Sequence, residues 1–318
     1  MSKQTANSQA EAKHKAPKTI DTASDSLERH HAATQDARAA GALKSQRARS
    51  MTEKLLTRTT SGLIYALCIF GCLLWGRIPT TLLVAAMAWL CGSEFFRMVR
   101  LAGRMPNEFI GLFAAVLYPL AALAKPEAET GVTLLLMLAV GVWYVLTPRA
   151  SVSDASITVF GAAYTGLLFS SVVTIRACDP GLDGALLTLG TMGSVWVNDA
   201  FAYLVGSRIG KHKLAPRISP NKSVEGLIGG LVGSCLIWTI GWALGVRGIE
   251  LPLALLVGVV SGLAGVVGDL FESRLKRSVG VKDSGNLMPG HGGLLDRSDS
   301  MLFACMTAYF ILHFGGIL

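Results

Sequence analysis

The sequence predicts an all-α membrane protein, a polytopic bundle of about nine transmembrane helices with the N-terminus inside and the C-terminus outside. Of its 318 residues, 51% are hydrophobic and only 16% are charged. The mean hydropathy is +0.48, and long apolar stretches recur from Ser61 onward. This balance is typical of a membrane protein. In lipid such stretches must be helices, because an unpaired backbone N–H or C=O group in hydrocarbon costs several kcal/mol.

The first 57 residues differ in composition from the rest of the chain. They are rich in Ala, Ser, Gln, Lys and Asp and hold few large apolar side chains. A segment of this kind cannot bury enough apolar surface to offset the entropy lost on folding. We therefore expect residues 1–57 to be a disordered polar tail, residues 58–182 to be a first group of transmembrane helices, and residues 183–318 to be a second group with polar loops.

Nine apolar stretches after the tail are predicted as membrane spans. They are residues 61–76, 78–93, 107–124, 130–147, 155–175, 184–206, 224–246, 250–272 and 300–317. The first two are short against the ~20 residues that a full crossing needs. Only Arg77 separates them, so they form either a tight hairpin or one broken element.

The distribution of Lys and Arg predicts the orientation. With the N-terminus inside, the outward loops hold only Arg77, Lys125, Arg176 and Arg247, and the inward loops hold the other basic residues outside the tail. Loops rich in Lys and Arg stay on the cytoplasmic side. We therefore expect a multi-pass protein of the cell (inner or plasma) membrane whose polar loops face the cytoplasm.

A first polar cluster lies at the end of the sixth span and includes Asn198 and Asp199. On a helix, Asp199, Tyr203 and Gly206 share one face, because they are four and seven residues apart. They could line a site. A structural Asp that is hydrogen-bonded between helices explains Asp199 equally well.

A second polar cluster is the loop between Lys211 and Gly226, where two prolines exclude a continuous helix. Ser219 and Lys222 offer hydrogen-bond donors there, and Ser223 can cap the next helix. Free N–H groups at a helix N-terminus suit a phosphate. The basic residues alone are explained as well by a cytoplasmic anchor, although Glu225 adds nothing to an anchor.

A third polar cluster begins inside the eighth span. Asp269, Glu272 and Lys276 lie on one helical face, and Asp296 and Asp299 follow at the start of the ninth span. A carboxylate within a membrane span is costly unless it is paired or bound to a cation. Acidic residues also suit a helix N-terminus. The alternative is that these carboxylates converge on a hard divalent cation, which prefers oxygen ligands.

The third cluster also carries a resemblance to a known family. From Ser273 to Asp299 the chain reads S-x-x-K-R-x4-K-D-x-G-x3-P-x-H-G-G-x-x-D-R-x-D, which resembles the signature of the phosphatidate cytidylyltransferase (CDP-diacylglycerol synthase) family. Residues 196–226 are similar to that family's second motif. The resemblance implies transfer of a cytidylyl group from CTP to phosphatidic acid in phospholipid biosynthesis, with Mg²⁺ as cofactor and a second cation as an option.

The resemblance also implies roles for the matched residues, and it makes residues 183–318 the catalytic region. The expected metal ligands are Asp269, Asp296 and Asp299. The expected catalytic residues are Asp269, Asp296, Lys276, Arg277, Lys282, His291 and Arg297. The expected substrate-binding residues are Asn198, Asp199, Ser219, Lys222, Glu225, Asp283, Gly292 and Gly293. The attacking phosphatidate oxygen is already anionic, so positioning and charge neutralisation should matter more than a strong base.

Two other functions fit part of the pattern. A CTP-dependent lipid kinase would move the γ-phosphoryl group instead, and a cation transporter would use Asp199, Asp269 and Asp296 as an ion path. A transporter predicts polar residues through the depth of several spans, whereas here they gather at cytoplasmic ends. The expected partners are CTP, phosphatidic acid and the lipid bilayer, with no nucleic acid. Glycine pairs spaced by four residues, such as Gly226 with Gly230, predict close helix contacts and permit a homodimer.

Overall fold

The computed structural model describes residues 59–60, 62–125, 127–287 and 292–318. The expected tail, residues 1–57, therefore lies outside the described residues. The described residues belong to one unit that begins at Thr57.

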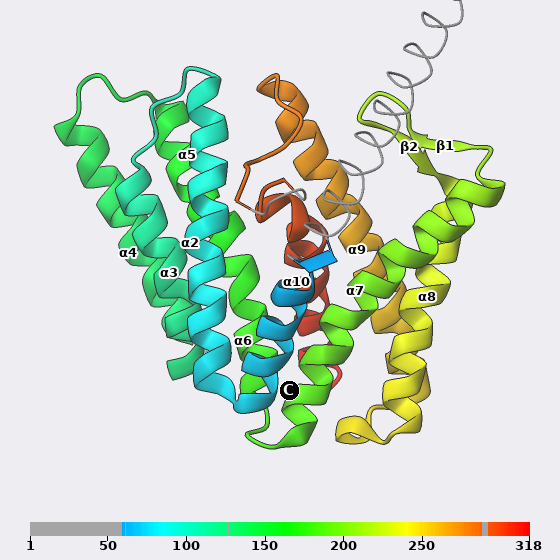
Figure 1. The fold of residues 1–318 in the computed structure, drawn as a ribbon. Coiled ribbons are helices and arrows are strands. Elements are labelled where there is room, and N and C mark those ends of the chain that lie inside the picture. The colour runs from blue at the N-terminus through cyan, green and yellow to red at the C-terminus, as the bar shows by residue number, and fades with distance from the viewer. Residues whose placement is uncertain (1–58, 61, 126, 288–291) are drawn as a thin grey trace, which may run out of the picture. The chain divides into compact units, whose positions relative to one another are not determined.

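Helices make up most of the described chain (Figure 1). In chain order the elements are a helix Gly62–Trp75, α2 (Arg77–Leu101), α3 (Glu108–Ala124), α4 (Glu127–Leu146), α5 (Val152–Ala162), the π-helix η1 (Ala163–Leu167), α6 (Leu168–Ala177), α7 (Leu182–Ile209), β1 (Lys213–Ala215), β2 (Ser219–Ser223), α8 (Val224–Ala243), the 3-10 helix η2 (Val246–Gly248), α9 (Leu251–Ser278), the 3-10 helix η3 (Leu295–Arg297) and α10 (Asp299–Phe314). Each of the nine predicted apolar stretches is helical. The predicted all-α class is thus confirmed for the described residues, apart from one short hairpin.

Five of the described helices are long and apolar enough to cross a membrane. They are α2, α4, the continuous stretch Val152–Ala177, α8 and α9. Three shorter apolar helices are Gly62–Trp75, α3 and α10. Helix α7 has 28 residues, but its glycines, hydroxyl side chains, Asn198 and Asp199 dilute its hydropathy. The count of nine crossings and the orientation stay predictions.

The first two predicted spans are separate helices joined at a sharp turn. Gly76 has φ of +142°, which glycine adopts at no steric cost because it has no Cβ. The chain reverses direction there, and α2 begins at Arg77 (Figure 1). The hairpin alternative is therefore the correct one. Helix α2 also runs on to Leu101, beyond the predicted end at residue 93.

Glycines set the close packing of α8 between α7 and α9. A Cβ added to Gly230 would lie 2.0 Å from Asn198 Oδ1, and one added to Gly258 would lie 2.8 Å from the Cα of Cys235. At Gly230 and Gly258 the close helix contacts predicted from the glycine spacing are thus present within this chain. The homodimer stays a prediction.

Gly230→Ala is expected to destabilise the protein by about 1–3 kcal/mol, because the added methyl group overpacks the α7–α8 contact. Gly241→Ala is the matched control on the same helix, since a Cβ there meets nothing within 4 Å. Alanine also has the higher helix propensity. Thermal unfolding in detergent should show a lower midpoint for Gly230→Ala alone. Equal midpoints for the two variants would contradict the close contact.

The largest hydrophobic cluster joins the two halves of the chain. Phe95 and Phe96 of α2 pack in it with Tyr164 of η1 and with Met301 and Leu302 of α10, and all five side chains are buried. The core therefore continues across residue 182. As a result, the first helices help to hold the residues that precede α10.

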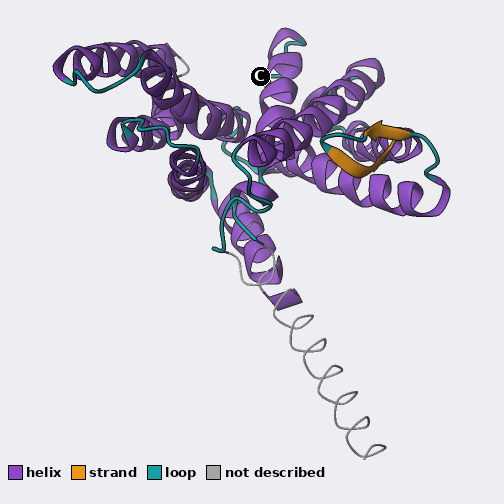
Figure 2. Cartoon of the chain, turned by 90° about the horizontal axis from the view of Figure 1, so that it is seen from above, coloured by secondary structure: helices purple, strands orange, loops and turns teal. Residues whose placement is uncertain are grey.

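Both polar loops lie at the same end of the helices. The β1–β2 hairpin and the segment after α9 lie near the C-terminal ends of α7 and α9 (Figure 1). The strands are antiparallel, with Lys213 opposite Ser223, and the view from above places this hairpin over the helix ends (Figure 2). Two loops that are distant in sequence thus lie at one end of the bundle.

Candidate active site

A pocket of about 710 Å³ lies between α7, the hairpin, α8, α9 and the start of α10. Small-molecule sites typically enclose about 300–1,000 Å³ and carry a few convergent polar groups. The polar lining residues are Asp199, Tyr203, Ser207, Asn221, Lys222, Ser223, Asp269, Lys276, Asp283, Asp296, Arg297, Asp299 and Ser300. Its size and its mixed charges fit a polyanionic ligand together with a cation.

The pocket brings together many of the residues singled out in the sequence. Those that line it are Asp199, Lys222, Asp269, Lys276, Asp283, Asp296, Arg297 and Asp299. Those that are described but do not line it are Asn198, Ser219, Glu225, Arg277, Lys282, Gly292 and Gly293. His291 lies outside the described residues. All three predicted polar clusters therefore contribute to one site.

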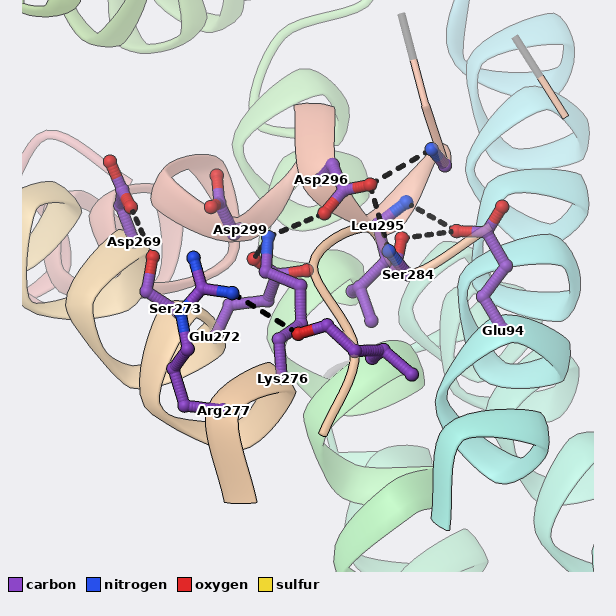
Figure 3. Close-up of polar contacts among 12 residues, drawn as sticks. Glu94, Asp269, Glu272, Ser273, Lys276, Arg277, Ser284, Leu295, Asp296 and Asp299 are labelled. Atoms are coloured by element: carbon purple, nitrogen blue, oxygen red, sulfur yellow. Dashed lines mark hydrogen bonds and ion pairs between the residues drawn. The ribbon is translucent and has the colours of Figure 1, made fainter. Parts of the chain in front are cut away.

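Lys276 of α9 lies at the centre of an ion-pair network. Its ammonium group contacts Glu272 one turn earlier, and it contacts Asp296 Oδ1 at 2.5 Å (Figure 3). Glu272 is fully buried. A buried charge is tolerated only when it is paired, so the two carboxylates fix the position of the ammonium group at the pocket wall.

Asp296 organises the segment before α10. Its Oδ2 atom accepts hydrogen bonds from the backbone N–H groups of Ser284 and Gly293, each at 2.9 Å. Burial favours the neutral acid, but the hydrogen bonds from Lys276 and Gly293 and the Lys276 charge outweigh it, so the pKa of Asp296 is lowered. Asp296 is therefore an ionised carboxylate whose two oxygens already accept hydrogen bonds.

Three further carboxylates share one region of the pocket. They are Asp199 on α7, Asp269 on α9 and Asp299 on α10, and all three line it. Lys222 on β2 pairs with Asp269 Oδ2 at 2.6 Å. Within the described ranges, no three His, Cys, Asp or Glu side chains are already arranged around a metal position.

The hairpin carries Lys222 into the pocket and leads directly into α8. Ser223 caps α8, because its Oγ accepts a hydrogen bond from the Gly226 N–H at 3.1 Å. The predicted cap is thus confirmed. Both Ser223 and Gly226 line the pocket, so the N-terminus of α8 opens toward it, as an anion site requires.

Two predicted substrate-binding residues hold helices and loops together instead of lining the pocket. Asn198 is buried on α7, and its Nδ2 donates to the Gly262 carbonyl on α9 at 3.1 Å. Glu225 accepts from the backbone N–H groups of Lys211 and His212, and it contacts His212 Nδ1 at 2.6 Å. Their contacts place the α7–α9 pair and the base of the hairpin.

Glu94 is not among the residues predicted from the sequence. It is the only charged residue between Arg77 and Arg97, but the predicted span ended at residue 93 and left it in a loop. In the structure it is buried in α2 and accepts hydrogen bonds from Ser284 Oγ and from the backbone N–H groups of Leu294 and Leu295. A lone carboxylate in an apolar run was the available signal.

Comparison with known proteins gives consistent matches. Residues 56–315 match the model of the cytidylyltransferase family. The chain is 33% identical over 268 residues to the phosphatidate cytidylyltransferase of Bacillus subtilis. This alignment covers 82% of this chain and 97% of that protein. It is 31% identical over 281 residues to the phosphatidate cytidylyltransferase of Synechocystis, with 80% and 95% covered. The chain belongs to the cytidylyltransferase family.

Proposed function

We propose that this protein transfers the cytidylyl group of CTP to phosphatidic acid and releases CDP-diacylglycerol and pyrophosphate. The observation that carries the proposal is the pocket at one end of apolar helices, where Lys222, Lys276 and Arg297 meet the carboxylates of Asp269 and Asp299. Cations suit the phosphates of two anionic substrates, and the neighbouring apolar helices suit a lipid. The family membership supports the same reaction.

The chemistry needs little acid–base assistance from the protein. A phosphatidate oxygen forms a bond to the α-phosphorus of CTP, the bond from that phosphorus to the bridging oxygen breaks, and pyrophosphate leaves. Because the attacking oxygen is already anionic, catalysis depends on positioning and on neutralising charge. Lys276 suits this role, since Glu272 and Asp296 hold its ammonium group in place.

The proposed Mg²⁺ would be held by pocket carboxylates. Asp269 and Asp299 are hard oxygen donors from two helices, and Asp199 of a third helix lines the same pocket. This donor set fits Mg²⁺, which binds through one or two carboxylates together with substrate phosphates. Asp296 of the predicted set contacts Lys276 and two N–H groups, much as Asp269 contacts Lys222 and Ser273. Asp296 therefore stays a proposed ligand, and Asp199 is a further candidate. The cation would neutralise charge on the triphosphate.

We place the pocket on the cytoplasmic side of the inner membrane, with nine crossings and the N-terminus inside. One observation, together with the positive-inside rule, supports this orientation. The basic loops gather at the pocket end of the helices (Figure 1), and loops rich in Lys and Arg favour the cytoplasmic side. The apolar pocket residues Ala202, Leu227 and Val266 offer a surface toward the acyl chains while the phosphates stay among the cations.

Labelled CTP distinguishes the proposed reaction from a lipid kinase. Purified protein in detergent would receive phosphatidic acid, Mg²⁺ and CTP labelled at either the α or the γ phosphorus. Label from the α position is expected in the lipid product, and label from the γ position in pyrophosphate. Lipid labelled only from the γ position would indicate a kinase, and no labelled lipid from either nucleotide would reject both reactions.

A further inference from the structure

Helix α2 supplies a buried carboxylate to the segment that precedes α10. Glu94 is only 8% exposed. Its Oε1 accepts from the Leu294 N–H at 3.1 Å, and its Oε2 accepts from the Leu295 N–H at 2.8 Å and from Ser284 Oγ at 3.0 Å. One side chain therefore holds two stretches of the segment, residue 284 and residues 294–295 (Figure 3).

The backbone of this segment closes tightly around the carboxylate. A Cβ added to Gly285 would lie 2.3 Å from Glu94 Oε1, and one added to Gly293 would lie 2.5 Å from Glu94 Oε2. Real Cβ atoms do not approach an oxygen this closely, so a side chain at either position would displace the Glu94 carboxylate. Gly285 and Gly293, the second of which was expected to bind substrate, thus make room for Glu94.

Ser284 connects Glu94 to the pocket. Its hydroxyl donates to Glu94, and its backbone N–H donates to Asp296 Oδ2 at 2.9 Å. Asp296 in turn contacts Lys276. A continuous series of contacts therefore runs from α2 to the ammonium group at the pocket wall, although Glu94 itself is not among the residues that line the pocket.

We propose that Glu94 is a positioning residue for cytidylyl transfer: it holds the segment that carries Asp296, and through Asp296 it places Lys276. The proposal rests on the proposed function. Burying a carboxylate is costly, and an apolar side chain would fill the same space without that cost. The three hydrogen bonds instead specify the path of the segment, and small errors of placement at a reacting centre lower the rate greatly.

Glu94→Gln tests this role. The amide keeps the size of the side chain but offers only one accepting oxygen, so at least one backbone N–H of the segment loses its acceptor. If Glu94 positions Lys276 for the transition state, kcat should fall at least about tenfold while the KM for CTP changes by less than about threefold. Both constants are measured with α-labelled CTP in detergent.

Asp154→Asn is the matched control. Asp154 is also a buried carboxylate that holds a loop, since it accepts from the backbone N–H groups of Met105 and Ser151 and from the Ser151 hydroxyl. Asp154 does not line the pocket. Because it also removes an acceptor from a buried loop, Asp154→Asn should lower the unfolding midpoint about as much as Glu94→Gln does. Because Asp154 lies outside the pocket, kcat and KM of this variant should stay within about twofold of wild type.

The outcomes separate the two proposals. An inactive wild-type protein would reject the proposed function itself. With an active wild type, a kcat for Glu94→Gln within about threefold of normal, or an equal loss in Asp154→Asn, would overturn the positioning role. If Glu94→Gln does not fold, Ser284→Ala decides, because it removes only the hydroxyl link: a fall in kcat supports the role, and an unchanged kcat overturns it.

Discussion

Lys276→Met is expected to reduce kcat by about 10²–10³-fold, in the range found when a single charge-stabilising donor is removed from an active site. The ammonium group lies at the pocket wall between Glu272 and Asp296. Methionine fills a similar volume but cannot neutralise phosphate charge. It also leaves two carboxylates buried without their cation, and breaking a buried pair in this way costs about 3–5 kcal/mol of stability.

Arg274→Met is the control for this prediction. It removes a positive charge from the same helix two residues earlier, where the side chain is exposed and does not line the pocket. Transfer of α-label to lipid and thermal unfolding would be measured for both variants. A near-normal kcat for Lys276→Met would exclude Lys276 from the reaction, and an unchanged unfolding midpoint would show that the ion-pair network adds little stability.

Asp269→Asn is expected to reduce kcat/KM by a similar factor, about 10²–10³-fold, and to raise the Mg²⁺ concentration needed for half-maximal activity. Asp269 pairs with Lys222 and lines the pocket together with Asp199 and Asp299. The amide has nearly the same shape but lacks the charge, so it binds a divalent cation weakly. Lys222 also loses its partner and can bind elsewhere in the pocket.

A Mg²⁺ titration of activity checks this prediction, with Asp183→Asn as the control. Asp183 is exposed in the first turn of α7, at the end opposite to Asp199, and it does not line the pocket. The control should follow the wild-type titration. Wild-type activity of Asp269→Asn at every Mg²⁺ concentration would remove Asp269 from the metal site.

Helix positions in this chain are predictable from sequence because they depend on local properties. A run of apolar residues must satisfy its own backbone hydrogen bonds in lipid, so each predicted stretch is a helix. The start of α8 follows from the capping side chain of Ser223, which is confirmed by its hydrogen bond to Gly226. The end predicted for α2, residue 93, was wrong because Glu94, Arg97 and Arg100 suggested a loop. In the structure, hydrogen bonds from residues distant in sequence stabilise Glu94 within the helix.

The residues that line the pocket were predictable in part. Charged residues in an apolar chain are costly, so Asp269, Lys276 and Asp299 could be singled out, and all three line the pocket. The role of each polar residue was less predictable. Asn198 and Glu225 lie in the same motif as Asp199 and Lys222, but they hold elements together away from the pocket.

The helical class, the apolar stretches, the cap of α8 and the charged segments that form one site could all be predicted from the sequence, because they follow from hydropathy, local capping and the cost of burying charge. Which charges are partners emerged only from the packed structure. Lys276 with Asp296 and Glu94 with Ser284 join residues far apart in the chain. Such pairs depend on how helices pack, and packing brings together side chains whose distance along the sequence carries no information about their distance in space.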